Sequence, residues 1–154
     1  MDDSHVLLIE DGAEDILLMG RAFSRAGIEG AVSVVKDGDE ALDYLRRTAD
    51  AEILRREPLP SLILLDLNLP GKSGLEVLEW IRRQPHLKRV PVVVLTSAWN
   101  HSAVNRAYSL GANSFIVKPV GFEQLVETVK ALKHYWLDLN QRPRRGFWKL
   151  EGPV

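Results

Sequence analysis

The chain has 154 residues, with 21 acidic and 20 basic side chains, 45% hydrophobic residues and no cysteine. This length predicts one domain with its own core, and the missing cysteines exclude disulfides, thiolate metal sites and cysteine nucleophiles. No run of about 18 apolar residues could span a bilayer, and the start of the chain lacks the pattern of an export signal. We therefore expect a cytoplasmic protein with no membrane partner.

The charges are unevenly distributed along the chain. Residues 1–66 contain 15 acidic and 7 basic side chains, whereas residues 67–154 contain 6 acidic and 13 basic ones. A general nucleic-acid binder carries a clear excess of basic residues, so the near-neutral total predicts no nucleic-acid partner. The acidic first half needs another explanation.

Short apolar runs alternate with stretches of helical spacing. The runs are continuous and rich in Val, Ile and Leu, which is typical of strands buried on both faces. The predicted strands are residues 6–9, 31–35, 62–65, 92–95 and 115–117. The predicted helices are residues 15–26, 38–54, 74–83, 101–110 and 122–136. The alternation predicts an α/β fold, a doubly wound parallel sheet with helices on both faces.

The C-terminal segment has a composition of its own. We place the domain at residues 1–137 and a tail at 138–154, which is too short for a DNA-binding domain. A disordered end is one interpretation of this tail. The aromatic residues Tyr135, Trp136, Phe147 and Trp148 favour the other, a homodimer contact through the last helix and the tail.

Polar residues follow four of the predicted strands. In chain order they are Glu10 and Asp11, Asp66, Thr96 and Ser97, and Lys118. Because ligands of open α/β sheets bind at the carboxyl ends of the strands, we expect these side chains to meet in one crevice. Thr96 and Ser97 could instead cap the next helix, and Asp66 alone could simply cap a turn.

Three carboxylates in one crevice would repel one another by a few kcal/mol per pair at an effective dielectric constant of about 20. A hard divalent cation relieves this repulsion, and Mg²⁺ takes one or two carboxylates together with water and phosphate oxygens. Lys118 could pair with phosphoryl oxygens, and the Thr96 hydroxyl could donate to one of them. Asp66 could then act as a nucleophile that forms an acyl phosphate.

Four segments carry a family resemblance. They are VLLIED ending at Asp11, LILLDLNLPGKSG around Asp66, VVVLTS around Thr96, and FIVKP around Lys118. In this order and on these elements, the motifs resemble the receiver domain of two-component response regulators, over roughly residues 4–137. The longer second connection and the segment that ends the last helix resemble stand-alone regulators paired with phytochrome-type histidine kinases.

The resemblance implies a role for each matching residue. Asp66 matches the phosphoacceptor, and Glu10 and Asp11 match the acidic pair that holds Mg²⁺, for which Mn²⁺ is expected to substitute. Asn68 matches the position whose main-chain carbonyl binds the metal. Thr96 matches the switch hydroxyl, and Lys118 matches the lysine that binds the phosphoryl group.

The resemblance also implies a flavodoxin-like strand order, 2-1-3-4-5, and a sensor histidine kinase as partner. Phe115 matches the aromatic switch position, where many relatives have Tyr, and the bond before Pro119 is usually cis in the family. Gly12 departs from the family, because many relatives have a polar side chain there, and would leave that rim of the crevice open.

Two other functions compete with a phosphorylated response regulator. An aspartate-nucleophile phosphohydrolase would need a second acid two residues after Asp66, where this chain has Asn68. A pseudo-receiver would bind partners without phosphorylation, and the complete set of residues from Glu10 to Lys118 disfavours it.

Overall fold

Five parallel strands form the centre of the computed structural model, which describes residues 4–50, 52–53 and 59–143. In spatial order the strands are β2 (Val32–Val35), β1 (Val6–Ile9), β3 (Leu62–Leu65), β4 (Val92–Thr96) and β5 (Ser114–Val117). All neighbouring pairs are parallel, with Val6 beside Val32 on one side and beside Leu62 on the other. The predicted order 2-1-3-4-5 is confirmed.

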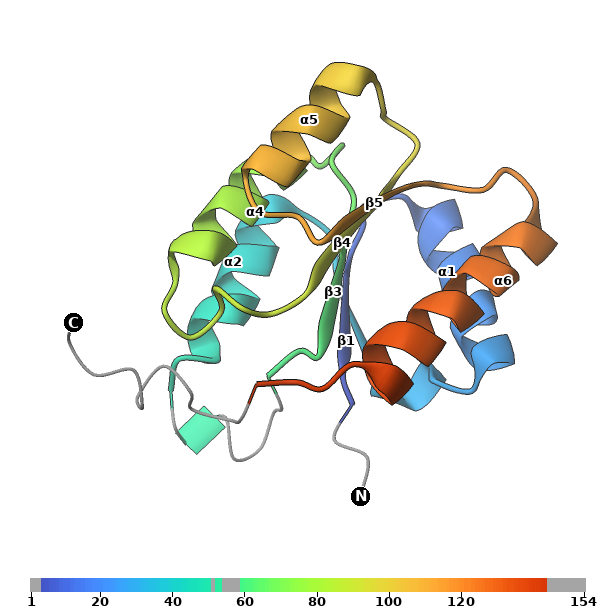
Figure 1. Cartoon of the computed structure of the whole chain (residues 1–154), viewed down its shortest axis with the longest axis horizontal. Helices are drawn as coiled ribbons and strands as arrows, with labels where there is room; N and C mark the ends of the chain where they lie inside the picture. The colour runs from blue at the N-terminus through green and yellow to red at the C-terminus, as the bar shows by residue number, and fades with distance from the viewer. Residues whose placement is uncertain (1–3, 51, 54–58, 144–154) are drawn as a thin grey trace.

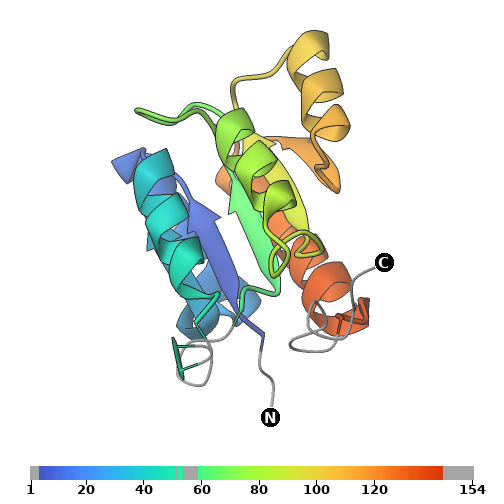
Figure 2. The same cartoon turned by 90° about the vertical axis from the view of Figure 1, so that its left-hand side faces the viewer.

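Helices cover both faces of this sheet (Figures 1 and 2). The helices α2 (Gly38–Arg47), α4 (Gly74–Arg83) and α5 (His101–Ser109) lie on one face. The helices α1 (Ala13–Ala26) and α6 (Phe122–Leu132) lie on the other. A short 3-10 helix, η1 (Glu29–Ala31), leads into β2, and a π-helix, η2 (Lys133–Leu139), continues α6. The doubly wound α/β architecture is therefore confirmed.

The strands divide their side chains between two cores because successive residues point to opposite faces. On β1, Leu7 and Ile9 pack in the core beneath α2, α4 and α5. Val6 and Leu8 pack in the core beneath α1 and α6. All four are almost completely buried, which explains why the strand sequences are continuously apolar.

Side-chain caps fix where three helices begin. Asp37 accepts a hydrogen bond from the Glu40 N–H at the start of α2, and Ser73 accepts one from Glu76 at the start of α4. Asn100 accepts one from Ala103 at the start of α5. The cap of α5 is therefore Asn100 and not Thr96 or Ser97, which leaves the Thr96 hydroxyl free for another role.

Two predicted helices were wrong in extent or type. The second regular helix ends at Arg47 and not at 54, because the N–H groups of residues 48–50 bond carbonyls three residues back and Thr48 Oγ1 bonds the Leu45 carbonyl. The last helix changes to π geometry after Leu132, where the Asn140 N–H reaches the Tyr135 carbonyl five residues earlier.

The remaining predicted bounds agree with the structure to within two residues, and 6–9, 62–65 and 74–83 agree fully. The bond before Pro119 is trans, since no cis peptide occurs among the described residues, so the implied cis bond was wrong.

Phe147 and Trp148 of the predicted tail lie outside the described residues. Within the described parts of the chain, no helix is long and apolar enough to cross a membrane.

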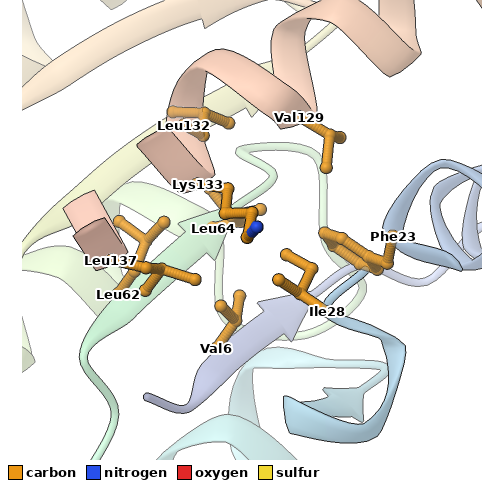
Figure 3. Close-up of a pocket in the computed structure, with 9 residues that line it drawn as sticks. All are labelled: Val6, Phe23, Ile28, Leu62, Leu64, Val129, Leu132, Lys133 and Leu137. Atoms are coloured by element: carbon orange, nitrogen blue, oxygen red, sulfur yellow. The ribbon is translucent and has the colours of Figure 1, made fainter. Parts of the chain in front are cut away.

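A small apolar pocket lies at the amino ends of β1 and β3, between η2, α6 and the end of α1 (Figure 3). Its lining is Val6, Phe23, Ile28, Leu62, Leu64, Val129, Leu132, Lys133 and Leu137. Eight of these side chains are apolar, so the pocket is a gap in core packing. It lies at the opposite end of the strands from the predicted crevice.

Candidate functional site

The carboxyl edge of the sheet gathers the four predicted strand ends. The main chain continues the strand ladder one residue past three strands, since the N–H groups of Glu10, Asp66 and Lys118 donate to Val35, Ile9 and Thr96 carbonyls. These bonds are 2.9 to 3.0 Å long. The side chains that follow the strands are thereby held at fixed positions on a rigid scaffold.

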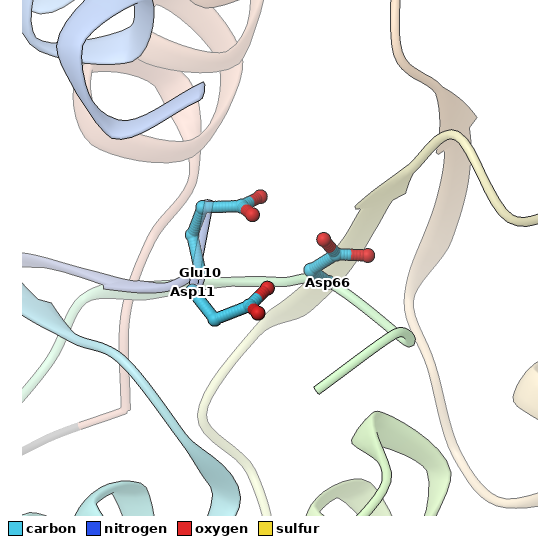
Figure 4. Close-up of side chains that lie close together, drawn as sticks. All are labelled: Glu10, Asp11 and Asp66. Carbon is cyan, nitrogen blue, oxygen red and sulfur yellow. The ribbon is translucent and has the colours of Figure 1, made fainter. Parts of the chain in front are cut away.

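Three carboxylates meet at this edge (Figure 4). Glu10, Asp11 and Asp66 each offer one oxygen, and these oxygens lie within 4.8 Å of one another. Glu10 is 2% exposed and Asp66 7% exposed, whereas Asp11 is open to solvent. An all-oxygen donor set with one exposed member fits Mg²⁺, which keeps several water ligands. The predicted metal residues are therefore brought together.

Lys118 closes the other side of the cluster. Its ammonium contacts Glu10 Oε2 and lies 3.3 Å from Asp66 Oδ2. A third carboxylate, Asp15 Oδ2, lies 3.2 Å from the same nitrogen. Asp15 was not predicted from the sequence, although an acid in the first turn of the helix that follows the acidic pair is a usable signal.

Burial changes the protonation of this cluster. It raises the pKa of Glu10 from 4.5 to about 7, with Asp66 adding to the shift and hydrogen bonds from Lys118 and Gly12 opposing it. Burial by itself lowers the pKa of Lys118, but the hydrogen bond to Glu10 and the charges of Asp66, Glu10 and Asp15 outweigh it and raise that pKa. Near neutral pH the lysine is therefore a cation, while Glu10 can gain or lose a proton.

The two oxygens of Asp66 have different partners. Oδ1 accepts a 2.6 Å hydrogen bond from the Thr96 hydroxyl and a 3.2 Å bond from the Asn68 N–H. Oδ2 faces Lys118. A hydroxyl, a main-chain N–H and an ammonium thus donate to this carboxylate and fix its orientation, which suits a candidate nucleophile.

Phe115 lies apart from the carboxylates. It is half-buried on β5 and packs against the core beneath α2, α4 and α5. Asn68 has an exposed side chain, and its contact with Asp66 is made by the main-chain N–H. The metal role of the Asn68 carbonyl and the switch role of Phe115 stay predictions.

The fold and this cluster define a class of α/β protein, the phosphoacceptor receivers of two-component signalling. Residues 6–130 match the response regulator receiver domain. The chain therefore belongs to the response regulator receiver domain family. Receiver domains are signalling modules and in general not enzymes that turn over a separate substrate.

Relatives of known name match nearly the whole chain. It is 43% identical over 138 residues to the probable methanogenesis regulatory protein FilR2 of Methanothrix harundinacea, covering 90% of this chain and 86% of FilR2. It is 37% identical over 133 residues to the response regulator Rcp1 of Synechocystis sp., covering 86% of this chain and 88% of Rcp1.

Solved structures agree in fold. The phosphorylated cyanobacterial phytochrome response regulator RcpA has a TM-score of 0.81 at 39% identity, with 92% of this chain and 99% of RcpA covered. The Mn²⁺-bound form of Rcp1 has a TM-score of 0.78 at 35% identity, with the same coverage of 92% and 99%. The chain is a response regulator with the receiver fold of these proteins.

Proposed function

We propose that Asp66 accepts a phosphoryl group from the phosphohistidine of a sensor histidine kinase. An oxygen of Asp66 bonds to phosphorus as the phosphorus–nitrogen bond breaks, and the electron pair of that bond stays on the ring nitrogen. With a proton on its other nitrogen, the imidazole leaves neutral. The carrying observation is the buried Asp66 carboxylate, held by the Thr96 hydroxyl on one oxygen and facing Lys118 on the other.

We assign the cation site to Glu10, Asp11 and Asp66, with the main-chain carbonyl of Asn68 as a further ligand. Mg²⁺ bound there would neutralise the carboxylates and the charge on the transferred oxygens. Three carboxylate oxygens within 4.8 Å support this assignment. We expect Mn²⁺ to substitute, and the solved Mn²⁺-bound form of Rcp1 supports that expectation.

Lys118 and Thr96 would stabilise the transferred group. The Lys118 side chain is only 10% exposed, so the attraction of its ammonium to phosphoryl oxygens is weakly screened. The Thr96 hydroxyl would turn from Asp66 to a phosphoryl oxygen. Lys118 and Thr96 would thus promote phosphorylation of the chain's own Asp66 and not of a separate substrate. The acyl phosphate should then hydrolyse slowly by in-line attack of water.

Phosphorylation would act as a switch through Thr96 and Phe115. Movement of the Thr96 hydroxyl toward the phosphoryl group empties space next to β5, and Phe115 would repack into it. The half-buried position of Phe115 against the core supports this step. Output would leave through the surface formed by α5, β5 and α6, which would exist in two states.

The proposed phosphodonor is a phytochrome-type histidine kinase. The likeness to RcpA, which is described as a phytochrome response regulator, supports this partner. The cytoplasm stays the predicted compartment for this reaction. The chain's position in its signalling pathway would then be that of phosphoryl acceptor or relay.

A homodimer through the last helix and the tail is a further proposal about partners. Tyr135 is 52% exposed and Leu139 57% exposed on η2, which supports a contact with a second copy there. Sedimentation of the full chain and of a chain truncated after Leu139 tests this. The same oligomeric state in both chains would reject a role for the tail in dimerisation. The boundary between domain and tail near residue 137 stays a prediction.

Intact-mass measurement after incubation with Mg²⁺ and acetyl phosphate tests the proposed function. We expect one labile phosphoryl adduct that is absent in Asp66→Asn and abolished by EDTA. An adduct that persists in Asp66→Asn would overturn the site assignment. Turnover of a small phosphate ester would favour the phosphohydrolase, and the absence of any adduct would favour the pseudo-receiver.

A further inference from the structure

Among the described residues, Asp15 is the one carboxylate in contact with Lys118 that does not come from a strand end. It belongs to the first turn of α1, and its Oδ2 lies 3.2 Å from the Lys118 nitrogen. Its side chain is 48% exposed, compared with 10% for Lys118. Both residues line an open recess between α1 and the loop after β5. The pair therefore stands between the buried cluster and solvent.

Gly12 makes room for this contact. A Cβ atom at position 12 would lie 3.1 Å from Asp15 Oδ2 and 3.3 Å from Glu10 Oε1, closer than ordinary contacts between carbon and neighbouring atoms. A side chain at position 12 would therefore press on the Asp15 carboxylate that reaches Lys118. The absence of a side chain at Gly12 thus leaves space for the Asp15 carboxylate of α1 to reach Lys118.

The three carboxylates around Lys118 would have different roles once Asp66 is phosphorylated. Asp66 would become an acyl phosphate, and its negative charge would move onto the phosphoryl oxygens. Glu10 belongs to the cluster of three acids that fits a cation. Asp15 lies outside that cluster, so its contact with Lys118 does not compete with either task.

We propose that Asp15 is a positioning residue that holds the Lys118 ammonium where the phosphoryl group arrives. A lysine side chain has several rotatable bonds, and a further carboxylate 3.2 Å from the Lys118 nitrogen limits the directions that the ammonium can take. This inference rests on the proposed phosphorylation of Asp66. It adds to the reaction a residue of α1 that touches neither the phosphoryl group nor the cation.

Asp15→Asn tests the effect on the reaction, and Glu14→Gln is the matched control. The control removes the same charge from the same helical turn at an exposed residue. Because the Asp15 carboxylate is half-exposed, we expect adduct formation with acetyl phosphate and Mg²⁺ to slow about three- to tenfold in Asp15→Asn. Glu14→Gln should stay within about twofold of the unmodified chain, and Asp15→Glu should recover most of the rate.

Nuclear magnetic resonance of metal-free protein tests the contact without any reaction. We expect the ε-methylene signals of Lys118 to shift in Asp15→Asn and to stay in place in Glu14→Gln. Unchanged Lys118 signals would overturn the inference. So would an Asp15→Asn chain that is phosphorylated at the rate of the unmodified one, or an Asp15→Glu chain as slow as Asp15→Asn. An unmodified chain that takes no phosphoryl group, together with shifted Lys118 signals, would instead reject the proposed function.

Discussion

The Thr96 hydroxyl donates a 2.6 Å hydrogen bond to Asp66 Oδ1 and accepts a 3.1 Å bond from the Ala98 N–H. Thr96 is completely buried. A hydroxyl carries a single proton, so it can donate either to Asp66 or to a phosphoryl oxygen at one time. Under the proposed function, the Thr96 hydroxyl would give up its bond to Asp66 and donate to a phosphoryl oxygen once Asp66 is phosphorylated.

Thr96→Ala removes this donor and should slow adduct formation with acetyl phosphate. We expect the rate to fall about tenfold, which is less than the hundredfold or more typical for loss of a single oxyanion donor, because the Asn68 N–H and Lys118 remain near Asp66. Intact-mass time courses at fixed Mg²⁺ measure the rate. Thr96→Ser keeps the hydroxyl and should lie within about threefold of the unmodified chain. A serine variant as slow as the alanine variant would argue against the hydroxyl as the active group.

Mg²⁺ affinity should rise with pH through the range set by Glu10. Burial raises the pKa of this carboxyl to about 7, so below that pH a cation must displace its proton. We expect the apparent affinity to fall by up to about tenfold per pH unit below 7 and to level off above 8. Titration calorimetry in buffers of different ionisation enthalpy measures both the affinity and the protons released.

Glu10→Gln is the control for this pH dependence. The amide cannot ionise, so the variant should bind Mg²⁺ more weakly and should lose the proton release between pH 6 and 8. If the Mg²⁺ affinity of Glu10→Gln still rises with pH over this range, the released proton belongs to another group.

The strand ends were predictable because one physical rule places them. Buried parallel strands need continuous apolar sequence, and the first polar residue after each strand falls at the carboxyl edge of the sheet. Glu10, Asp66 and Lys118 each follow a strand in this way. Their meeting in one cluster therefore follows from topology alone.

Features set by the tertiary environment were not predictable in this way. The helical pattern of α2 continues past Arg47, but hydrogen bonding by Thr48 ends the regular helix there. The change to π geometry in η2 leaves no periodic signal over seven residues. The reach of Asp15 to Lys118 depends on the bare backbone of Gly12, which only the three-dimensional arrangement reveals.

Gly74→Ala should damage stability and phosphorylation together. A Cβ at position 74 would overlap the Asp66 carbonyl oxygen and lie 2.6 Å from Leu67 Cα, both of them backbone atoms that cannot turn away. The loop that carries Asp66 and Asn68 would have to move. We expect the free energy of unfolding to fall by about 1–3 kcal/mol, measured by urea denaturation, and adduct formation to slow.

Gly20→Ala is the matched control, because nothing lies within 4 Å of a Cβ at this position in α1. The alanine should leave phosphorylation unchanged and stabilise the helix by up to about 1 kcal/mol. If Gly74→Ala has the same free energy of unfolding as the unmodified chain, the loop after β3 adapts to the added methyl group without loss of stability.

Arg82 should be important for stability and not for phosphorylation. Its guanidinium donates to the carbonyls of Gly111 at 2.9 Å and Val90 at 2.7 Å, and to Asn113 Oδ1 at 2.8 Å. These bonds tie the end of α4 to the start of β4 and to the turn after α5. Arg82→Ala removes the donor to the partly buried Gly111 and Val90 carbonyls, whereas Asn113 Oδ1 keeps its bond from the Val92 N–H. We expect a loss of about 2–4 kcal/mol in the free energy of unfolding.

Arg82→Lys tests whether geometry or charge matters. A lysine keeps the charge but cannot reach three diverging acceptors, so it should recover less than half of the loss. Arg83→Ala is the control, since Arg83 is exposed and pairs only on the surface with Glu79, an interaction worth about 0.5 kcal/mol or less. All three variants should form the phosphoryl adduct at the unmodified rate well below their melting temperatures. A slowed reaction in Arg82→Ala with unchanged stability would instead connect this end of α4 to the site.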